Sequence, residues 1–165
     1  MRIDPEKLKD FLVDTGLITL KGFRDIQKEA QGDIEKIEEQ LVKKGILSEP
    51  NLLQVKGHIG GFPFINLERS IIDPDTLKLI PEETAKSLNI IAYRKYKDTL
   101  EVAMLEPDNL QTMDFIKKKT GLDILPRLTN KTSLESALRQ YEESLQEEFS
   151  QIVNKASKES KIESF

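Results

Sequence analysis

The sequence contains no cysteine and no tryptophan, and it has a single histidine, His58, among its 165 residues. The absence of cysteine excludes disulfide bonds, thiolate zinc sites and thiol catalysis. A lone histidine without a neighbouring carboxylate or nucleophile seldom takes part in catalysis or metal binding, so we expect His58 on the surface or in a loop. No acid pair, metal-ligand cluster or nucleophile with its base stands out among the 29 acidic residues. We therefore expect no catalytic residues, no metal site and no cofactor.

Long hydrophobic runs are also absent. No window has the apolar length of a transmembrane helix, and the N-terminus lacks the apolar core of a secretory signal. The chain also lacks the glycine-rich sequence ending in Gly-Lys-Ser/Thr that binds nucleotide phosphates. We expect a cytoplasmic protein that does not insert directly into the membrane and does not hydrolyse ATP with these residues.

Charged residues are abundant, but neither sign dominates. They make up 33% of the chain beside 38% hydrophobic residues, with a net charge of -4, as in a folded protein with a heavily charged surface. This balance argues against a dedicated nucleic-acid-binding protein, which needs a clustered basic face. The local run Lys117-Lys118-Lys119 is interpreted as the solvated face of a helix.

An internal repeat occupies about the first sixty residues. Superposing Gly16 on Gly45 gives an offset of 29 residues under which the apolar pattern recurs. The offset places Leu8, Leu12, Val13, Leu17, Ile18, Thr19, Phe23 and Ile26 on Ile37, Leu41, Val42, Ile46, Leu47, Ser48, Leu52 and Val55. Self-similarity of this length indicates one supersecondary unit used twice, and the local signals predict helix, turn, helix.

Capping residues set the limits of these four short helices. Asp4 precedes a first helix over residues 5–15, which Gly16 ends in the left-handed conformation. Thr19, Asp33 and Ser48 are the predicted caps of the other three. The stretch Gly57–Phe64 then breaks the helical pattern. Because such short helices are marginal alone, we expect their apolar stripes to be buried against each other.

From residue 65 the pattern changes to short extended runs between helices. Asp73-Pro74 and Pro81-Glu82-Glu83 are helix-opening signals. Ile90–Tyr96 and Leu100–Leu105 flank a polar turn, as in a β-hairpin. A helix that opens at Pro107-Asp108 and runs to Thr120 leads to a third strand over Leu122–Leu128. The predicted fold class is α+β: a helical lobe, then a small lobe with a three-stranded, antiparallel-type sheet packed by helices.

A last helix is predicted after its cap, Thr132. Its apolar residues cover 22 positions in six steps, a mean step of about 3.7, which disfavours a long left-handed coiled coil. The stripe comprises Leu134, Leu138, Tyr141, Leu145, Phe149, Ile152 and Ala156. It is longer than so small a lobe requires, leaving Phe149 and Ile152 available for a partner or for a following domain. We divide the chain into a helical lobe (1–62), an α/β lobe (63–146) and a helix end with a frayed linker from Lys155 (147–165).

Four segments, taken in order, resemble the N-terminal module of type II secretion and type IV pilus assembly ATPases. They are Lys7–Thr19 in the first repeat, Gly61–Leu67, Ile80–Ala85 and Val102–Leu110. Together they cover about residues 5 to 145. The resemblance implies a hexameric ATPase domain C-terminal in the parent chain. It also implies docking to the cytoplasmic domain of an inner-membrane platform protein, which would recruit the chain to the inner-membrane face and couple the motor to the machine.

The resemblance also implies an alternative function, because some members bind cyclic di-GMP with the doubled motif. In those members an arginine and a glycine open each copy and a glutamine closes it. Here the arginines are replaced by Lys7 and Lys36, the glycines by Lys9 and Glu38, and the glutamines by Ala30 and Ile59. The candidate ligand-binding residues are Lys7, Leu8, Leu12, Lys36, Ile37 and Leu41. Lysine lacks the planar fork of arginine and a carboxylate opposes phosphate, so the competing interpretation is that these leucine-type residues form a core.

Overall fold

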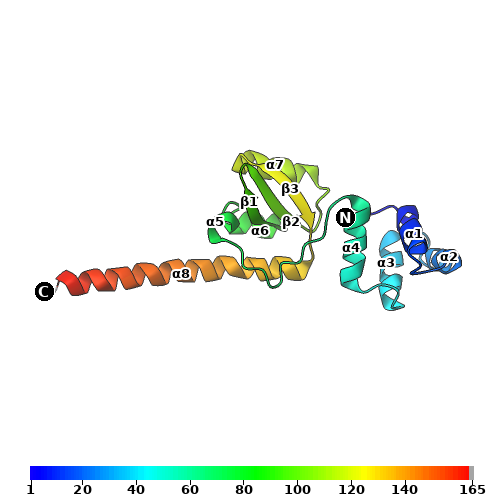
Figure 1. Cartoon of the computed structure of the whole chain (residues 1–165), viewed down its shortest axis with the longest axis horizontal. Helices are drawn as coiled ribbons and strands as arrows, with labels where there is room; N and C mark the ends of the chain where they lie inside the picture. The colour runs from blue at the N-terminus through cyan, green and yellow to red at the C-terminus, as the bar shows by residue number, and fades with distance from the viewer. Residues whose placement is uncertain (164–165) are drawn as a thin grey trace.

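The structure, a computed structural model, describes the backbone of residues 1–163 and the side chains of residues 1–147 and 149–156. Four helices form one lobe, a sheet with three helices forms a second, and a long C-terminal helix extends past the second lobe (Figure 1). Each lobe has its own cluster of buried apolar residues. None of the described helices combines the length and the hydropathy that a membrane span requires.

The helical lobe consists of α1 (Pro5–Asp14), α2 (Leu20–Glu29), α3 (Ile34–Lys43) and α4 (Glu49–Gly60). Each of the four begins after a side-chain cap that accepts a hydrogen bond from a backbone N–H of the first turn, at 3.0 to 3.2 Å. These caps are Asp4, Thr19, Asp33 and Ser48, as predicted. Local capping chemistry therefore defines where all four helices start.

The two halves of this lobe repeat each other in backbone conformation and in packing. Gly16 and Gly45, which the offset superposes, have φ angles of 76° and 74° and turn the chain between helices. The core takes its largest fully buried side chains from both repeats: Leu8, Leu12, Phe23, Ile37 and Leu41. The predicted doubled helix-turn-helix unit is confirmed.

The predicted break at Gly57–Phe64 is wrong for its first four residues. The helix α4 continues through His58 to Gly60, and the chain turns only at Gly61, which has a φ angle of 78°. The amide of Phe62 then donates a hydrogen bond to the carbonyl of Gly57 at 2.9 Å. Gly57 can remain helical because it lacks a Cβ, which allows the returning chain to lie against it. His58 is exposed, as expected, but it lies on a helix.

The α/β lobe contains α5 (Pro74–Leu77), α6 (Glu82–Leu88), β1 (Ile90–Tyr96), β2 (Thr99–Met104), α7 (Leu110–Thr120) and β3 (Asp123–Leu128). The three-stranded sheet is confirmed, with strand order β1-β2-β3. β1 and β2 pair antiparallel as a hairpin, whereas β2 and β3 pair parallel. The sheet is therefore mixed, because α7 returns the chain to the end of the sheet where β2 begins.

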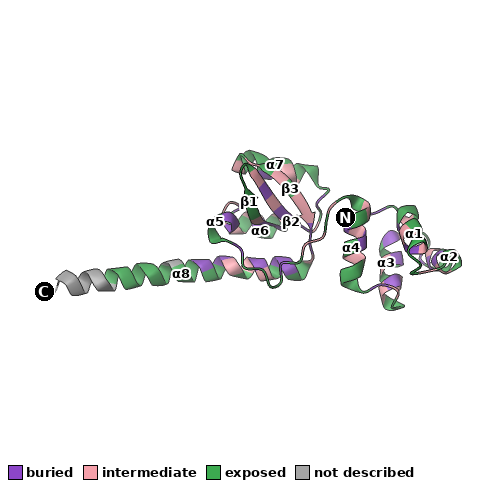
Figure 2. Cartoon of the chain, in the orientation of Figure 1, coloured by how far each residue is buried: buried purple, intermediate pink, exposed green. Residues whose placement is uncertain are grey.

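The long helix α8 (Lys131–Glu163) starts from a different cap than predicted. The side chain of Asn130 accepts a hydrogen bond from the amide of Ser133 at 2.8 Å, so Asn130 and not Thr132 caps the helix. α8 also remains helical where the sequence predicted a frayed linker from Lys155; residues 164–165 of that segment lie outside the described residues. Its first half packs on the α/β lobe, where Leu134, Ala137 and Tyr141 are buried (Figure 2).

A short connection joins the two lobes. The amide of Ile65 donates to the carbonyl of Leu128, and the amide of Leu128 donates to the carbonyl of Pro63, at 2.8 and 3.0 Å. Residues 63–65 thereby run parallel to the end of β3. The segment thus lies beside β3, and the boundary after residue 62 stays a proposal.

Candidate functional site

The six predicted ligand-binding residues separate into two kinds in the structure. Lys7 and Lys36 are exposed on α1 and α3. The four apolar residues, by contrast, are brought together in the core of the helical lobe, and none has measurable exposure: Leu8, Leu12, Ile37 and Leu41. Their side chains pack against one another, so they are not available to a ligand without opening the lobe.

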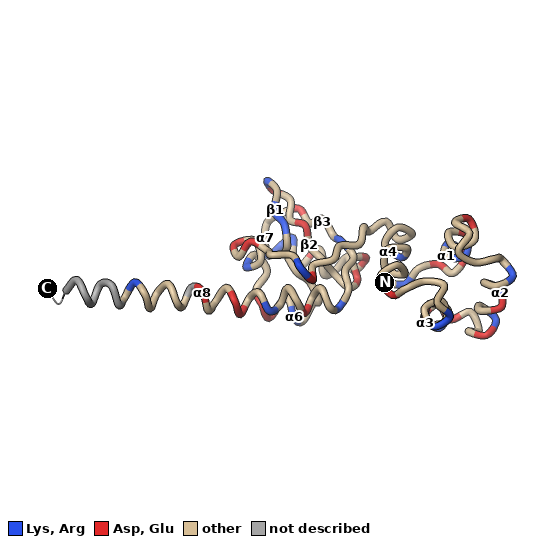
Figure 3. The backbone as a smooth tube through the Cα atoms, turned by 60° about the horizontal axis from the view of Figure 1, so that its bottom comes forward, with Lys and Arg blue, Asp and Glu red and all other residues tan. Residues whose placement is uncertain are grey.

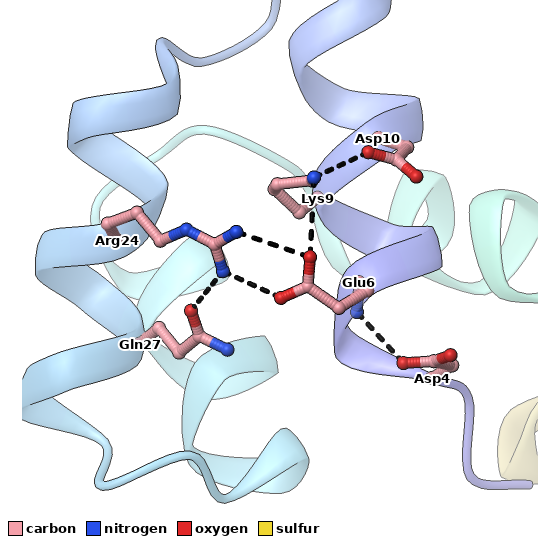
Figure 4. A network of polar contacts seen from close by, with 6 residues as sticks. All are labelled: Asp4, Glu6, Lys9, Asp10, Arg24 and Gln27. Atoms are coloured by element: carbon pink, nitrogen blue, oxygen red, sulfur yellow. Dashed lines mark hydrogen bonds and ion pairs between the residues drawn. The ribbon is translucent and has the colours of Figure 1, made fainter.

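An ion-pair network covers α1 and α2 beside these residues (Figure 4). The ammonium of Lys9 lies 2.6 Å from Asp10 Oδ1 and 3.3 Å from Glu6 Oε2. The guanidinium of Arg24 contacts both oxygens of Glu6, at 2.6 and 3.2 Å, and also Gln27 Oε1 at 2.7 Å. Lys9 stands where the cyclic di-GMP-binding motif has glycine. A long, ion-paired side chain therefore occupies the place where glycine would leave the backbone open.

Electrostatics within this network favour the charged forms. The hydrogen bonds of Arg24, and after it of Lys9, lower the pKa of Glu6 to about 2. Asp10, and after it Glu6, raises the pKa of Lys9. Both cations already face carboxylates, so a phosphate that approached them would have to displace Glu6 or Asp10.

The second repeat has an ion pair of its own at the corresponding position. The ammonium of Lys56 on α4 lies 3.2 Å from Glu38 Oε2 on α3, and the two side chains are only 14% and 13% exposed. Burial raises the pKa of Glu38 in spite of the opposing effect of Lys56. Glu38 thus places a largely buried carboxylate where the binding motif has its second glycine, and this charge disfavours an anionic ligand.

A feature that the sequence did not indicate is an apolar cavity of about 390 Å³ in the helical lobe. Its lining comprises Phe11, Leu17, Ile46, Leu47, Asn51, Gln54, Val55 and His58. The rings of Phe11 and His58 meet here, with their centroids 5.4 Å apart. Leu17 and Ile46, which the offset superposes, both line this cavity, so the repeat was the available signal.

The second candidate site is the apolar stripe of α8 beyond the α/β lobe. Leu145, Phe149 and Ile152 are 55%, 68% and 66% exposed, and Val153 beside them is also exposed. This part of α8 extends away from the rest of the molecule (Figures 1 and 2). The structure thus exposes both residues predicted to meet a partner, Phe149 and Ile152, and adds Leu145 and Val153 to them.

The first half of the same helix is firmly held, which gives the exposed half a fixed direction. The hydroxyl of Tyr141 donates to the carbonyl oxygens of Ile80 and Leu77, at 2.6 and 3.0 Å. Burial raises the pKa of this hydroxyl. Gln140 receives a hydrogen bond from the amide of Ile72 and donates one to the carbonyl of Ser70, at 2.9 and 2.8 Å. Among the described residues no group of three or more potential ligands could hold a metal ion.

Comparison with known proteins gives one family match and several relatives. The model of the MshEN domain matches residues 60–148, which is more than half of the chain. The type IV pilus assembly ATPase PilB of Myxococcus xanthus is 31% identical over 135 residues, covering 82% of this chain and 24% of the relative. PilB of Thermus thermophilus is 29% identical over 146 residues, covering 86% of this chain and 16% of the relative.

Among solved structures, that of MshE with cdg aligns with a TM-score of 0.61 at 25% identity. The alignment covers 81% of this chain and 97% of the other. The chain therefore spans a quarter or less of the curated relatives that it matches, but nearly the whole of this solved neighbour.

Proposed function

This chain belongs to the MshEN domain family, and we propose that it is the N-terminal, non-catalytic docking and regulatory module of a type IV pilus or type II secretion ATPase. In this proposal it binds the cytoplasmic domain of an inner-membrane platform protein and couples the ATPase of its parent chain to the machine. The observation that carries the proposal is the exposed apolar end of α8, with Leu145, Phe149 and Ile152 on one stripe.

Energetics favour a partner for this stripe. Burying a side chain of this size stabilises a complex by about 1.5–3 kcal/mol before the costs of association. Aromatic residues such as Phe149 are enriched, and charged residues depleted, in the buried core of protein interfaces. Tyr141 and Gln140 hold the preceding turns of α8, so little freedom would be lost when a partner covers the exposed turns.

The relatives support a role for the chain within a motor. Both curated relatives are pilus assembly ATPases, and this chain matches a minor share of each. No phosphate-binding loop occurs in its sequence. In this proposal hydrolysis belongs to the rest of the parent protein, and this domain transmits or regulates it from the inner-membrane face.

The experiment is a calorimetric titration of the chain with the cytoplasmic domain of its platform protein. We expect Phe149→Ser together with Ile152→Ser to weaken binding at least about tenfold, because both side chains would lie at the centre of the contact. The melting temperature should stay unchanged, because both side chains are exposed. The control is Gln146→Ser with Gln151→Ser, which changes two exposed polar residues of α8. Equal affinity for the wild type and the Phe149/Ile152 variant would contradict the proposed surface.

A second candidate function is binding of cyclic di-GMP, and one observation favours it. The aligned structure is MshE with cdg, and the alignment covers most of this chain. The geometry favours the docking function, because Lys9 and Glu38 fill the two glycine positions and are both ion-paired. Leu8 and Leu12 are core residues and offer no open surface.

A further inference from the structure

One end of the α/β lobe brings three segments together. The turn between β1 and β2, the start of β3 and the last turn of α7 all meet there. The amide of Asp123 donates to the carbonyl of Asp98 at 2.8 Å, which joins the start of β3 to the hairpin turn. The ammonium of Lys117 lies 3.7 Å from Asp123 Oδ1, which joins α7 to the same point. Residues far apart in sequence therefore form a single surface, which we call the basic end.

Six exposed cations lie on the basic end: Arg94, Lys95, Lys97, Lys117, Lys118 and Lys119. Arg94 pairs with Glu101 at 2.6 Å and Lys117 pairs with Asp123. In the part of the chain that the structure describes, no carboxylate lies within ion-pair distance of the other four. The nearby acids are Asp98, Glu101, Asp114 and Asp123. The surface is thus locally cationic on a chain whose net charge is -4.

Two exposed aromatic rings lie among these cations. Tyr96 is 70% exposed, and the ammonium of Lys97 lies 5.5 Å from its ring centre. Phe115 is 49% exposed, and the ammonium of Lys119 lies at the same distance from its ring. The strand residues 94–96 are exposed on both faces, so this end of the hairpin projects beyond the helices that cover the sheet.

We propose that the basic end binds the anionic surface of a phospholipid bilayer. Lysines attract acidic headgroups, and aromatic rings beside them are suited to the depth of those headgroups. Lysines in the last turn of a helix are also stabilised by the negative end of the helix dipole. This effect does not account for Lys95 and Lys97, which lie on the hairpin. In Figure 3 the backbone of β1 and of the hairpin tip carries the blue of Lys and Arg.

A bilayer fits this surface better than a nucleic acid does. Phe115 also borders a hollow against α6, but the residues that line this hollow include no cation. Among the described residues the cations therefore gather on the projecting end and not along the hollow, whereas a nucleic-acid strand is usually bound in a positively charged groove. The inference goes beyond the proposed docking function, because it involves different residues from the α8 stripe and requires no platform protein.

The test is sedimentation of the full chain with phosphatidylcholine vesicles, with and without phosphatidylglycerol, at low and at high salt. We expect binding only to vesicles that contain phosphatidylglycerol, weakened by salt. Lys95→Glu with Lys97→Glu, and separately Lys118→Glu with Lys119→Glu, should each lower partitioning by about 30-fold or more. The control, Lys21→Glu with Lys43→Glu, makes the same charge change on the helical lobe and should bind nearly as the wild type does.

Three results would overturn the proposal. Equal binding to both kinds of vesicle would show that anionic headgroups are not recognised, and an equal loss in the control would make the effect one of net charge. The third is binding of a single-stranded oligonucleotide that competes with the vesicles. A thermal melt of each variant separates loss of binding from loss of fold. Because the vesicles contain no platform protein, a failure to bind them would count against the bilayer proposal and not against the proposed docking of α8.

Discussion

At the scale of single residues, Tyr141 fixes the direction of α8. Its hydroxyl donates to the carbonyl of Leu77, the last residue of α5, and to that of Ile80 in the loop before α6. Tyr141→Phe leaves these carbonyls without the donor, and a buried polar group that loses its partner costs about 1–3 kcal/mol. We expect a loss of that size in the free energy of unfolding, measured with urea. Tyr96→Phe, at an exposed ring, is the control and should have no measurable effect. If the two variants were equally stable, the hydrogen bonds of the Tyr141 hydroxyl would not stabilise the packing of α8 on the lobe.

A second residue-scale prediction concerns the acid sensitivity of the helical lobe. Arg24 and Lys9 lower the pKa of Glu6 from 4.5 to about 2. Since the folded pKa is the lower one, the ion pairs stabilise the fold above about pH 4.5, and this contribution is lost as the pH falls toward 2. Glu6→Gln should therefore be slightly less stable than the wild type at neutral pH, because the pair is exposed. The difference should shrink as the pH falls below about 4.5.

The control for Glu6 is Glu39→Gln, which neutralises an exposed carboxylate of α3. Urea unfolding of both variants across this pH range makes the comparison. A constant difference between wild type and Glu6→Gln at every pH would contradict the assigned role of the ion pairs.

At the scale of elements, the end of α4 depends on one glycine. A Cβ on Gly57 would lie 2.4 Å from the carbonyl oxygen of Phe62, so Gly57→Ala must shift backbone and should cost about 1–3 kcal/mol. At Gly60 the nearest atoms belong to the flexible end of Met1, at 3.0 Å. Gly60→Ala should be neutral or stabilise the helix by up to about 1 kcal/mol. Chemical denaturation gives the free energy of unfolding of each variant. Equal effects of the two substitutions would argue against the close approach of Phe62 to Gly57.

The helices and strands also show which features the sequence could predict and which it could not. Caps such as Asp4 and Ser48 act through their own neighbours, so their roles were readable from local chemistry. The continuation of α4 past Gly57 depends on a chain that folds back from Phe62, and no local signal reveals it. The direction of β3 similarly depends on where α7 returns the chain, which propensities do not specify.

The candidate sites likewise combine features that were visible in the sequence with features that only the folded structure reveals. The period of the α8 stripe was visible in sequence, and so was its excess length over a small lobe. The exposure of Leu145, and the ion pairs that fill positions 9 and 38, required tertiary packing. Lys9 and Glu38 were recognised as departures from a motif, but only the structure shows that Glu6, Asp10 and Lys56 hold them in place.

At the scale of the whole molecule, the two lobes and α8 offer separate surfaces for separate tasks. The helical lobe has a closed core, whereas α8 carries its exposed stripe away from both lobes (Figure 1). If the chain is a docking module, its ligand-dependent changes should therefore be confined to α8. Any change that a cyclic dinucleotide caused in α1 and α3 would reveal a receptor instead.

Hydrogen–deuterium exchange of the chain, with the platform protein's cytoplasmic domain and separately with cyclic di-GMP, tests this claim most directly. We predict slower exchange over residues 145–156 of α8 with the platform domain, and no change in the helical lobe with cyclic di-GMP. Slower exchange in α1 and α3 with cyclic di-GMP, abolished by Lys7→Glu with Lys36→Glu, would contradict the account. So would platform binding that left α8 unchanged.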